Sequence, residues 1–430
     1  MTQTALVVSG LLILLLGSGV WIGLGLMATG GIGLLIFKST PVAALLGQLS
    51  WNSATVAELS SLPLFVLMAE ILFRTRIAAS IFDALAPWTT WLPGRLAHVN
   101  VAASTIFAAV SGSSAATAAT IGRITLPELA RRGYSQSLTM GSLAGAGTLG
   151  FLIPPSIVMI VYSVLAQVSL LDMFMAGIIP GLVLAILLSL TIVIMTLIKP
   201  ELLPKEKETF TWAHRFSALK KLAPVVILVG TIIGSMMTGI ATPSEAAAVG
   251  VIGAILIAMA MRDITFAGFR QALMGTVFTS SMIGLIVIGA GFLSTSMGYL
   301  GVPRAVAEAI APLNLGPVGL IMLLLLVYLV LGCFLDGIST IVMTLPMVLP
   351  LVVGAGYDPI WFGIFLIVTV EMAQITPPVG FNLFVIQGLT NTSTMQVAKA
   401  AFPFFLAMLV FAGLIVAAPG IVMWLPRLGN

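Results

Sequence analysis

A double proline inside a long apolar run constrains the fold of this chain more than any other feature. Pro377 and Pro378 lie in the run ITPPVGFN (375–382), within a segment that otherwise predicts one membrane-spanning helix. Each proline lacks an N–H and clashes with the carbonyl four residues earlier, so the carbonyls of Ala373 and Gln374 are expected to lose their helical partners. In hydrocarbon, such carbonyls are stable only where they face protein or a water-filled cavity.

The same kind of break occurs a second time. Pro154 and Pro155, in the run FLIPPS (151–156), interrupt another apolar segment and are expected to free the carbonyls of Gly150 and Phe151. Broken helices at corresponding positions of two halves are typical of secondary transporters, whose binding sites lie at the breaks.

The composition indicates an all-α polytopic membrane protein. Of the 430 residues, 60% are hydrophobic and 7% are charged, whereas soluble domains carry about 25% charged residues. The net charge of +4 is spread along the loops, so it gives no sign of nucleic-acid binding. The single cysteine, Cys333, excludes an internal disulfide or a cysteine metal cluster and is expected to be a packing residue.

The two halves of the chain form an internal repeat. The same interval separates Pro154 from Pro377 and Gly133 from Gly356, and further matches occur in the same order (Pro87 with Pro312, Pro93 with Pro317, 125–127 with 344–346). The first half has two arginines, Arg131 and Arg132, where the matching part of the second half has none. Since basic loops stay in the cytoplasm, the repeat is predicted to be inverted.

The predicted organisation has three parts. The first repeat is 1–198, with a re-entrant hairpin at about 93–126 and a broken helix at about 138–165. A charged cytoplasmic linker follows at 199–221. The second repeat is 222–430, with a hairpin at about 316–346 and a broken helix at about 359–389. We expect about ten transmembrane helices, two of them broken, and both termini outside.

Two acidic residues have ordinary structural explanations. Glu70 and Arg74 are four positions apart on one predicted helix, which favours an ion pair. Glu245 follows Thr242 and Pro243 in the pattern of a capping box with proline at the first helical position.

The hairpin tips and the breaks are expected to meet near the middle of the membrane and to offer oxygen ligands. Such ligands favour hard ions such as Na⁺ over soft metals. Asp336 is the one acid at a tip, and it either binds or gates an ion or caps a helix in contact with water. Glu371, one turn before the second break, is either a site residue or a structural one. The hydroxyls are those of Ser111, Ser113, Ser114, Ser339, Thr340 and Thr376.

Nothing in the sequence predicts an enzyme. The two histidines, His98 and His214, are far apart, and there is no Walker A motif, so the chain is not expected to hydrolyse ATP or to carry a cofactor.

Three segments resemble one family. GIATPSEAAA (239–248), GFLIPPS (150–156) and ITPPVGFNLF (375–384) are similar to the large membrane subunit of tripartite ATP-independent periplasmic (TRAP) transporters. The resemblance covers essentially the whole chain. The double prolines alone also look like those of dicarboxylate/sodium symporters of the wider ion-transporter superfamily.

The resemblance implies a sodium-coupled elevator-type importer in the bacterial inner membrane. Its expected partners are a small four-helix membrane subunit and a periplasmic substrate-binding protein, and its substrate is an organic acid such as a C4-dicarboxylate or a sialic acid. Since 1–37 predicts only two short spans, the small subunit is expected to be a separate chain.

The resemblance also implies the site residues. One Na⁺ would lie between the first tip (Ser111, Gly112, Ser113, Ser114) and the first break (Gly147, Gly150). The other would lie between the second tip (Asp336, Gly337, Ser339, Thr340) and the second break (Ala373, Thr376), and this second site is expected to carry the formal charge. The predicted substrate contacts are Ser114, Pro155, Ser156, Ser339, Pro378 and Asn382.

Two other hypotheses remain open at this stage. The first is a stand-alone sodium- or proton-coupled carboxylate symporter or exchanger, in which Asp336 and Glu371 are the candidates for proton transfer. The second is a membrane protein that does not transport, against which the inverted repeat argues. The sequence does not name the substrate.

Overall fold

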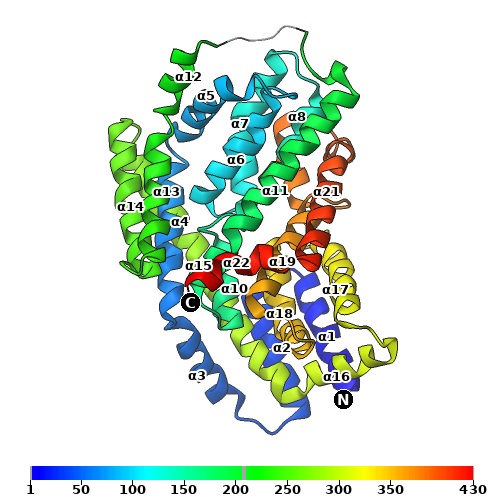
Figure 1. Ribbon diagram of the computed structural model, residues 1–430. Helices are drawn as coiled ribbons and strands as arrows, with labels where there is room; N and C mark the ends of the chain where they lie inside the picture. Colours follow the sequence, from blue (N-terminus) through cyan, green and yellow to red (C-terminus); the bar gives the residue numbers. More distant parts are fainter. Residues whose placement is uncertain (1, 206–209, 430) are drawn as a thin grey trace.

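The computed structural model describes residues 2–205 and 210–429, and this part of the chain is helical without any strand (Figure 1). The remaining linker residues, 206–209, lie outside the described residues. The all-α polytopic membrane fold predicted from the apolar composition is therefore confirmed.

The first helices begin and end where the glycines and the charged residues predict. α1 and α2 are separated at Gly17–Gly19, so the apolar run at 5–37 forms two short helices. A turn at Thr75 and Arg76 separates α4 from α5. The elements are α1 (Thr2–Gly17), α2 (Ile22–Phe37), α3 (Val42–Ala54), η1 (Ala57–Ser60), α4 (Ser61–Leu72) and α5 (Ile77–Thr89).

The first hairpin and the first broken helix follow. The hairpin helices α6 and α7 turn at Gly112 and Ser113, and the double proline separates α9 from α10, with a bend of 42°. The elements are α6 (Ala97–Ser111), α7 (Ser114–Arg131), α8 (Gln136–Gly147), α9 (Leu149–Leu152), α10 (Ile157–Ala166) and α11 (Leu170–Ile198).

The linker leads into a second group of long helices. α12 lies against α5, where Trp88 Nε1 donates a 3.0 Å hydrogen bond to the carbonyl of Arg215 and Lys221 pairs with Asp83 at 2.8 Å. The predicted capping box of Thr242 and Glu245 begins α14. The elements are η2 (Pro200–Leu202), α12 (Trp212–Leu219), α13 (Ala223–Met237), α14 (Pro243–Ala260) and α15 (Phe266–Leu300).

The second hairpin and broken helix complete the chain. α17 and α18 form the hairpin, and the double proline separates α19 from α20. The elements are α16 (Val302–Ile310), η3 (Ala311–Leu313), α17 (Pro317–Gly332), α18 (Gly337–Gly354), α19 (Pro359–Gln374), α20 (Phe381–Thr390), α21 (Thr394–Ala417) and α22 (Gly420–Gly429).

Both hairpins extend further than their prolines predict. α7 continues to Arg131 through Pro127, and α18 continues to Gly354 through Pro346 and Pro350. A proline inside a helix removes one N–H and bends the helix, but neighbouring helices can satisfy the freed carbonyl. The predicted hairpin ends at 126 and 346 are therefore too early.

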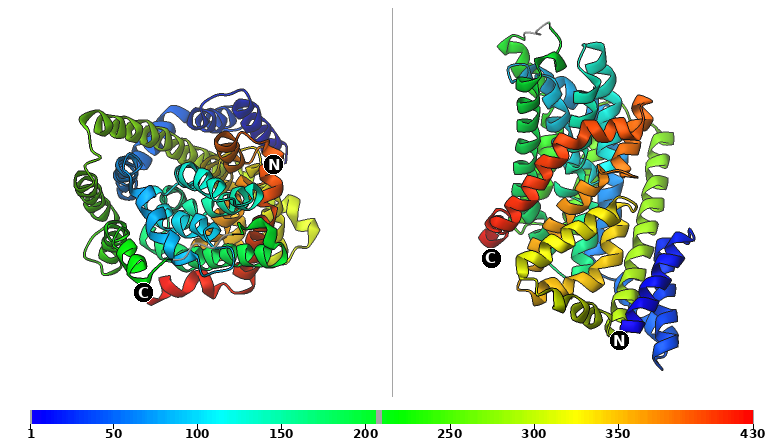
Figure 2. Two further views of the ribbon diagram at one scale, coloured as in Figure 1. Left: turned by 90° about the horizontal axis from the view of Figure 1, so that it is seen from above. Right: turned by 90° about the vertical axis from the view of Figure 1, so that its right-hand side faces the viewer.

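The two hairpins lie at opposite ends of the molecule. Figure 1 shows α6 and α7 in the upper half, beside α5 and α12, and α17 and α18 in the lower half, near the N-terminus. The right-hand view of Figure 2 gives the same arrangement, while its left-hand view places α13 and α14 at the periphery. This arrangement is the one expected of hairpins that enter from opposite faces.

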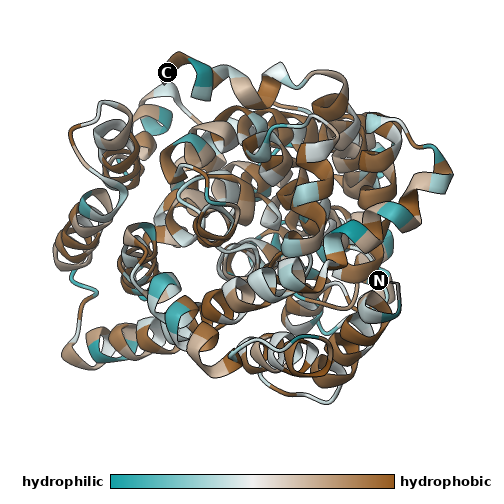
Figure 3. Cartoon of the chain, turned by 90° about the horizontal axis from the view of Figure 1, so that it is seen from below, coloured by the Kyte–Doolittle hydropathy of each residue, from teal (hydrophilic) through white to brown (hydrophobic). Residues whose placement is uncertain are grey.

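The helices are long and apolar enough for a membrane. In the described part of the chain, five helices can cross alone by length and composition, or up to nine if each bent pair is one span. α1 and α2, with 16 residues each, are shorter than this criterion. The count of ten spans therefore stays a prediction. Figure 3 shows hydrophobic residues over most of the helical surface.

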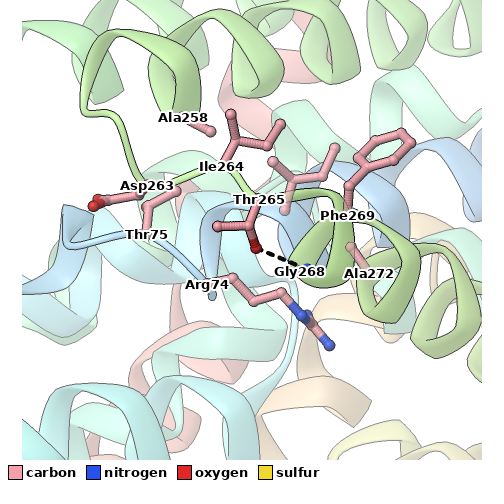
Figure 4. A pocket seen from close by; sticks show the side chains of 10 residues that line it. Arg74, Thr75, Ala258, Asp263, Ile264, Thr265, Gly268, Phe269 and Ala272 are labelled. Atoms are coloured by element: carbon pink, nitrogen blue, oxygen red, sulfur yellow. Dashed lines mark hydrogen bonds between the residues drawn. The ribbon is translucent and has the colours of Figure 1, made fainter.

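Charged residues tie the outer helices together. The predicted pair of Glu70 and Arg74 forms on α4, and Arg76 pairs with Asp263 of the α14–α15 connection at 2.9 Å. A hollow of about 20 Å³ beside them is lined by Arg74, Asp263 and Thr265 among others, and the Thr265 hydroxyl accepts a 3.0 Å hydrogen bond from the N–H of Gly268 (Figure 4). This hollow is a packing defect at the start of α15 rather than a site.

Candidate functional site

The first hairpin tip lies directly on the first break. The N–H of Ile157 donates a 3.2 Å hydrogen bond to the carbonyl of Gly112. Gly112 has φ +58°, and a Cβ there would lie 3.0 Å from the carbonyl oxygen of Pro155. Only glycine combines this left-handed backbone with so close an approach. Predicted tip and break residues are thus brought together.

Gly150 makes a second close approach between the same two segments. A Cβ at Gly150 would lie 2.5 Å from the backbone carbonyl of Ser113 and 2.6 Å from the backbone nitrogen of Ser114. A Cβ at Gly147 would lie 2.9 Å from the Cβ of Ala118. The tip and the broken helix therefore meet backbone to backbone, and any side chain at Gly150 would push them apart.

Several predicted hydroxyl ligands are used within their own segments. Ser111 shares a 2.6 Å hydrogen bond with Thr117. Ser113 caps α7, accepting a 3.4 Å hydrogen bond from the N–H of Ala116. Ser156 caps α10 in the same way and is fully buried. These side chains shape the tip and the break, and their hydroxyl oxygens have lone pairs left for a ligand.

Ser114 connects the first tip to the second half of the chain. Its hydroxyl lies 2.9 Å from Glu371 Oε2 and 3.2 Å from the carbonyl of Gly147, and it accepts a 2.7 Å hydrogen bond from the amide of Asn382. A hydroxyl has one proton, so it donates fully to either Glu371 or Gly147 but not to both. Asn382, a predicted substrate contact, is therefore brought to the first tip.

Glu371 is the most deeply buried acid at either break. It is 1% exposed, and its Oε1 has no hydrogen-bond partner, although the backbone N–H of Phe151 faces the carboxylate. Asn382 Oδ1 and Gln374 Nε2 are also buried without partners. Unpartnered polar atoms in a protein interior are costly, so three of them along one broken helix mark a place for water, an ion or a substrate.

The second tip is organised around a helix cap. Asp336 is exposed and caps α18, accepting a 3.2 Å hydrogen bond from the N–H of Ser339 and a second one from the Ser339 hydroxyl. The Thr340 hydroxyl donates to the backbone carbonyl of Asp336 at 2.9 Å. This arrangement gives Asp336 the predicted cap in contact with water, and its predicted role in binding or gating an ion stays a prediction.

The second tip also touches the second break through its backbone. The N–H of Gly380 donates a 3.3 Å hydrogen bond to the carbonyl of Cys333. A Cβ at Gly332 would lie 2.5 Å from the Cβ of Ala373, and one at Gly337 would lie 2.4 Å from the ring of Phe151. The second tip therefore contacts both breaks.

One prediction about the second break is wrong. The carbonyl of Ala373 keeps a partner, because the N–H of Thr376 donates to it at 3.1 Å. The Thr376 hydroxyl donates to the carbonyl of Met372 at 2.8 Å. The last turn before the prolines thus tightens and recovers one of the two expected free carbonyls. Pro378, a predicted substrate contact, is exposed, whereas Pro155 is buried.

The sequence alone did not indicate the contact between Ser114 and Glu371 or the buried amide of Gln374. An acid one turn before a double proline in an apolar run was the available signal for Glu371. No local sequence pattern indicates which distant residue Glu371 contacts.

Comparison with known proteins identifies related membrane permeases. Residues 9–421 match the family model of the DctM component of tripartite ATP-independent periplasmic transporters. The C4-dicarboxylate TRAP transporter large permease DctM of Vibrio cholerae is 34% identical over 96% of this chain and 95% of its own length. The isethionate TRAP transporter permease DctMQ of Oleidesulfovibrio alaskensis is 30% identical over 96% of this chain and 64% of its own length.

A solved structure has a similar fold. The YdaH transporter of Alcanivorax borkumensis has a TM-score of 0.63, with 14% sequence identity, over 89% of this chain and 88% of that one. At this identity the likeness concerns the fold alone. From the family model and the relatives of nearly equal length, this chain belongs to the DctM family, the large membrane permeases of TRAP transporters, and is a transporter component rather than an enzyme.

Proposed function

We propose that this chain is the translocating subunit of a sodium-coupled, binding-protein-dependent importer of an organic acid in the bacterial inner membrane. The observation that carries the proposal is that the segment after each double proline donates a backbone hydrogen bond to a hairpin tip, Ile157 to Gly112 and Gly380 to Cys333. Such meeting points of half-helices are where secondary transporters bind substrate and coupling ions.

The oxygen ligands around both breaks favour sodium as the coupling ion. They are carbonyl, hydroxyl and carboxylate oxygens, which suit hard cations. The proposed ligands are Ser111, Gly112, Ser113, Ser114, Gly147 and Gly150 at the first pair, and Asp336, Gly337, Ser339, Thr340, Ala373 and Thr376 at the second. Apart from the coupling ion, no cofactor is proposed.

The proposed substrate is an organic acid of the C4-dicarboxylate or sialic acid type. A permease named for C4-dicarboxylates is 34% identical to this chain, and one named for isethionate is 30% identical. Both names describe small organic anions, which the positive ends of half-helices favour. Ser114, Pro155, Ser156, Ser339, Pro378 and Asn382 are the proposed contacts.

The proposed mechanism is an elevator. α6–α10 and α17–α20 contain both hairpins and both breaks, while α15 packs along α2 and α4 outside them. We propose that the first group carries substrate and ions across the membrane against the second, together with a small four-helix membrane subunit and a periplasmic binding protein.

Uptake by proteoliposomes tests the proposal. The purified chain, its small subunit and its binding protein are reconstituted, and uptake of radiolabelled succinate and N-acetylneuraminate is measured with an inward gradient of NaCl or KCl. We expect uptake of one of the two acids that needs Na⁺ and all three components. Equal uptake in KCl would contradict sodium coupling, and uptake by the chain alone would favour a stand-alone symporter.

A further inference from the structure

Two hydrogen bonds of Ser114 join the first hairpin tip to the second broken helix. Ser114 begins α7 in the first half, whereas Glu371 in α19 and Asn382 in α20 belong to the second half. The Ser114 hydroxyl lies 2.9 Å from Glu371 Oε2 and 2.7 Å from Asn382 Nδ2. All three residues are at most 1% exposed. The contact is therefore a buried connection between segments 257 positions apart.

Glu371 has no charged partner to explain its burial. In residues 2–205 and 210–429, no ion pair includes Glu371. A buried acid without a counter-ion is costly, so its position needs a reason. The neighbouring hydroxyl of Ser114 and backbone N–H of Phe151 come from the first tip and the first break. A residue of the second half thus holds both parts of the first pair.

The repeat does not contain a mirror image of this contact. By the interval that relates the two double prolines, Ser114 corresponds to Gly337 and Glu371 corresponds to Thr148. Gly337 has no side chain, and the Thr148 hydroxyl donates to the carbonyl of Gly145 in its own helix at 2.6 Å. Gly337 instead packs against the ring of Phe151. The two tips therefore meet around Phe151, and Glu371 is the acid that gives this crossing a polar connection, beside the amide of Asn382.

We propose that Glu371 is a positioning residue that couples the two hairpin tips, so that the first tip does not open or close independently of the second. The proposal rests on the proposed function, since it makes an ion bound at the first tip affect the second. It requires only that Glu371 accepts the hydrogen bond of Ser114, whichever ion or substrate binds nearby. Loss of the bond should therefore loosen the second tip even when the change is made at the first.

The only cysteine of the chain is a natural reporter for the second tip. Cys333 ends α17, is 7% exposed, and its thiol donates to the carbonyl of Leu329 at 2.9 Å. Its own carbonyl accepts the hydrogen bond from Gly380 at the second break. Because Cys333 is only 7% exposed, we expect a maleimide to react with this thiol faster when the tip moves away from the break. The rate of its modification therefore measures how often the second tip opens.

The experiment is a double-mutant cycle read at Cys333. The full chain in lipid nanodiscs is treated with N-ethylmaleimide in NaCl or in KCl, and the rate is followed by intact mass. The variants are Ser114→Ala, Glu371→Ala, Glu371→Gln and the double alanine variant. Ser163→Ala is the matched control, because its hydroxyl donates only to Met159 of its own helix.

We expect Ser114→Ala and Glu371→Ala each to raise the rate at least about fivefold, because each variant removes a hydrogen bond to a charged group, which is stronger than one between neutral groups. The double variant should be no faster than the faster single variant, since both changes remove one bond. Glu371→Gln keeps an acceptor oxygen and should lie between wild type and Glu371→Ala. Ser163→Ala should stay within about twofold of wild type.

The sodium arm separates this inference from the proposed function. In wild type, NaCl should slow modification relative to KCl, and both alanine variants should lose most of this difference. If Cys333 of wild type is modified at the same rate in NaCl and KCl, the result contradicts sodium coupling. The double-mutant cycle measured in KCl then decides the inference. Folded variants, judged by gel filtration, that react at the wild-type rate would overturn the inference. So would effects that add in the double variant.

Discussion

The two hairpin–break pairs share a framework and differ in chemistry. Ser113 and Asp336 occupy corresponding positions, and each caps the second helix of its hairpin. In the first pair the double proline is buried, whereas in the second pair both prolines and Asp336 are exposed. The buried acid, Glu371, comes from the second half but serves the first tip. Position in the repeat therefore does not decide where the charge of the site lies.

The two acids differ because their carboxylates lie in different surroundings. Asp336 accepts backbone hydrogen bonds at the positive end of a helix, where a carboxylate is stable at little cost. Glu371 lies in a closed interior where each unpartnered oxygen is expensive. An exposed cap needs no ligand to be stable, whereas a buried acid does. We therefore expect the buried charge of Glu371 at the first tip to affect ion coupling more than the exposed charge of Asp336, which remains a proposed ligand of the second pair.

The largest expected effect comes from separating the first pair. Gly150→Ala places a Cβ within 2.5 Å of the Ser113 backbone, and overpacking of this kind costs about 1–3 kcal/mol. We expect uptake in proteoliposomes to fall at least about tenfold. Gly413→Ala on α21, which has no atom within 4 Å of its Cβ position, is the control. Normal uptake by Gly150→Ala would show that the tight first pair is dispensable.

A smaller effect is expected from changing the amide that faces the buried acid. Asn382→Asp preserves the shape of the side chain but removes the donor to Ser114 and adds a second acid beside it. Asn382→Leu removes the same donor without adding an acid. We expect uptake to fall about tenfold for Asn382→Asp and about threefold for Asn382→Leu. The reverse order would show that the polarity at this position matters more than the absence of a second acid.

The smallest effect is expected at the exposed acid. Asp336→Ala removes a helix cap and should lower the stability of the protein by about 1 kcal/mol, whereas Asp336→Asn keeps the cap and should be nearly neutral. Thermal unfolding in detergent measures both. Equal destabilisation by the two variants would show that the charge of Asp336, rather than its capping geometry, holds the second tip.

Much of this architecture follows from local sequence. Two double prolines predict two breaks, since two consecutive prolines remove two N–H donors and both clash with the preceding turn, whereas α7 and α18 continue through single prolines. Thr242 and Glu245 predict their own capping box, and Glu70 predicts its pair with Arg74, because each partner lies within one helical turn. Asp336 and Ser339 are also close in sequence, and their three-residue spacing fits the N-cap that the structure contains.

The contacts that define the site were not predictable in the same way. Glu371 meets Ser114 across 257 positions, and that pairing depends on how the two hairpins cross in space. The recovery of the Ala373 carbonyl by Thr376 depends on a tightening of the last helical turn that propensities do not specify. Local patterns thus locate the breaks, whereas tertiary packing decides which polar groups meet there.

The most direct test compares the two acids in one assay. The Na⁺ concentration for half-maximal uptake is measured in proteoliposomes for wild type, Glu371→Gln and Asp336→Asn, each with the same small subunit and binding protein. Each variant replaces an acid by its amide of equal shape. We expect Glu371→Gln to raise this concentration at least about threefold more than Asp336→Asn does. A larger shift for Asp336→Asn would contradict the account and place the functional charge at the exposed second tip.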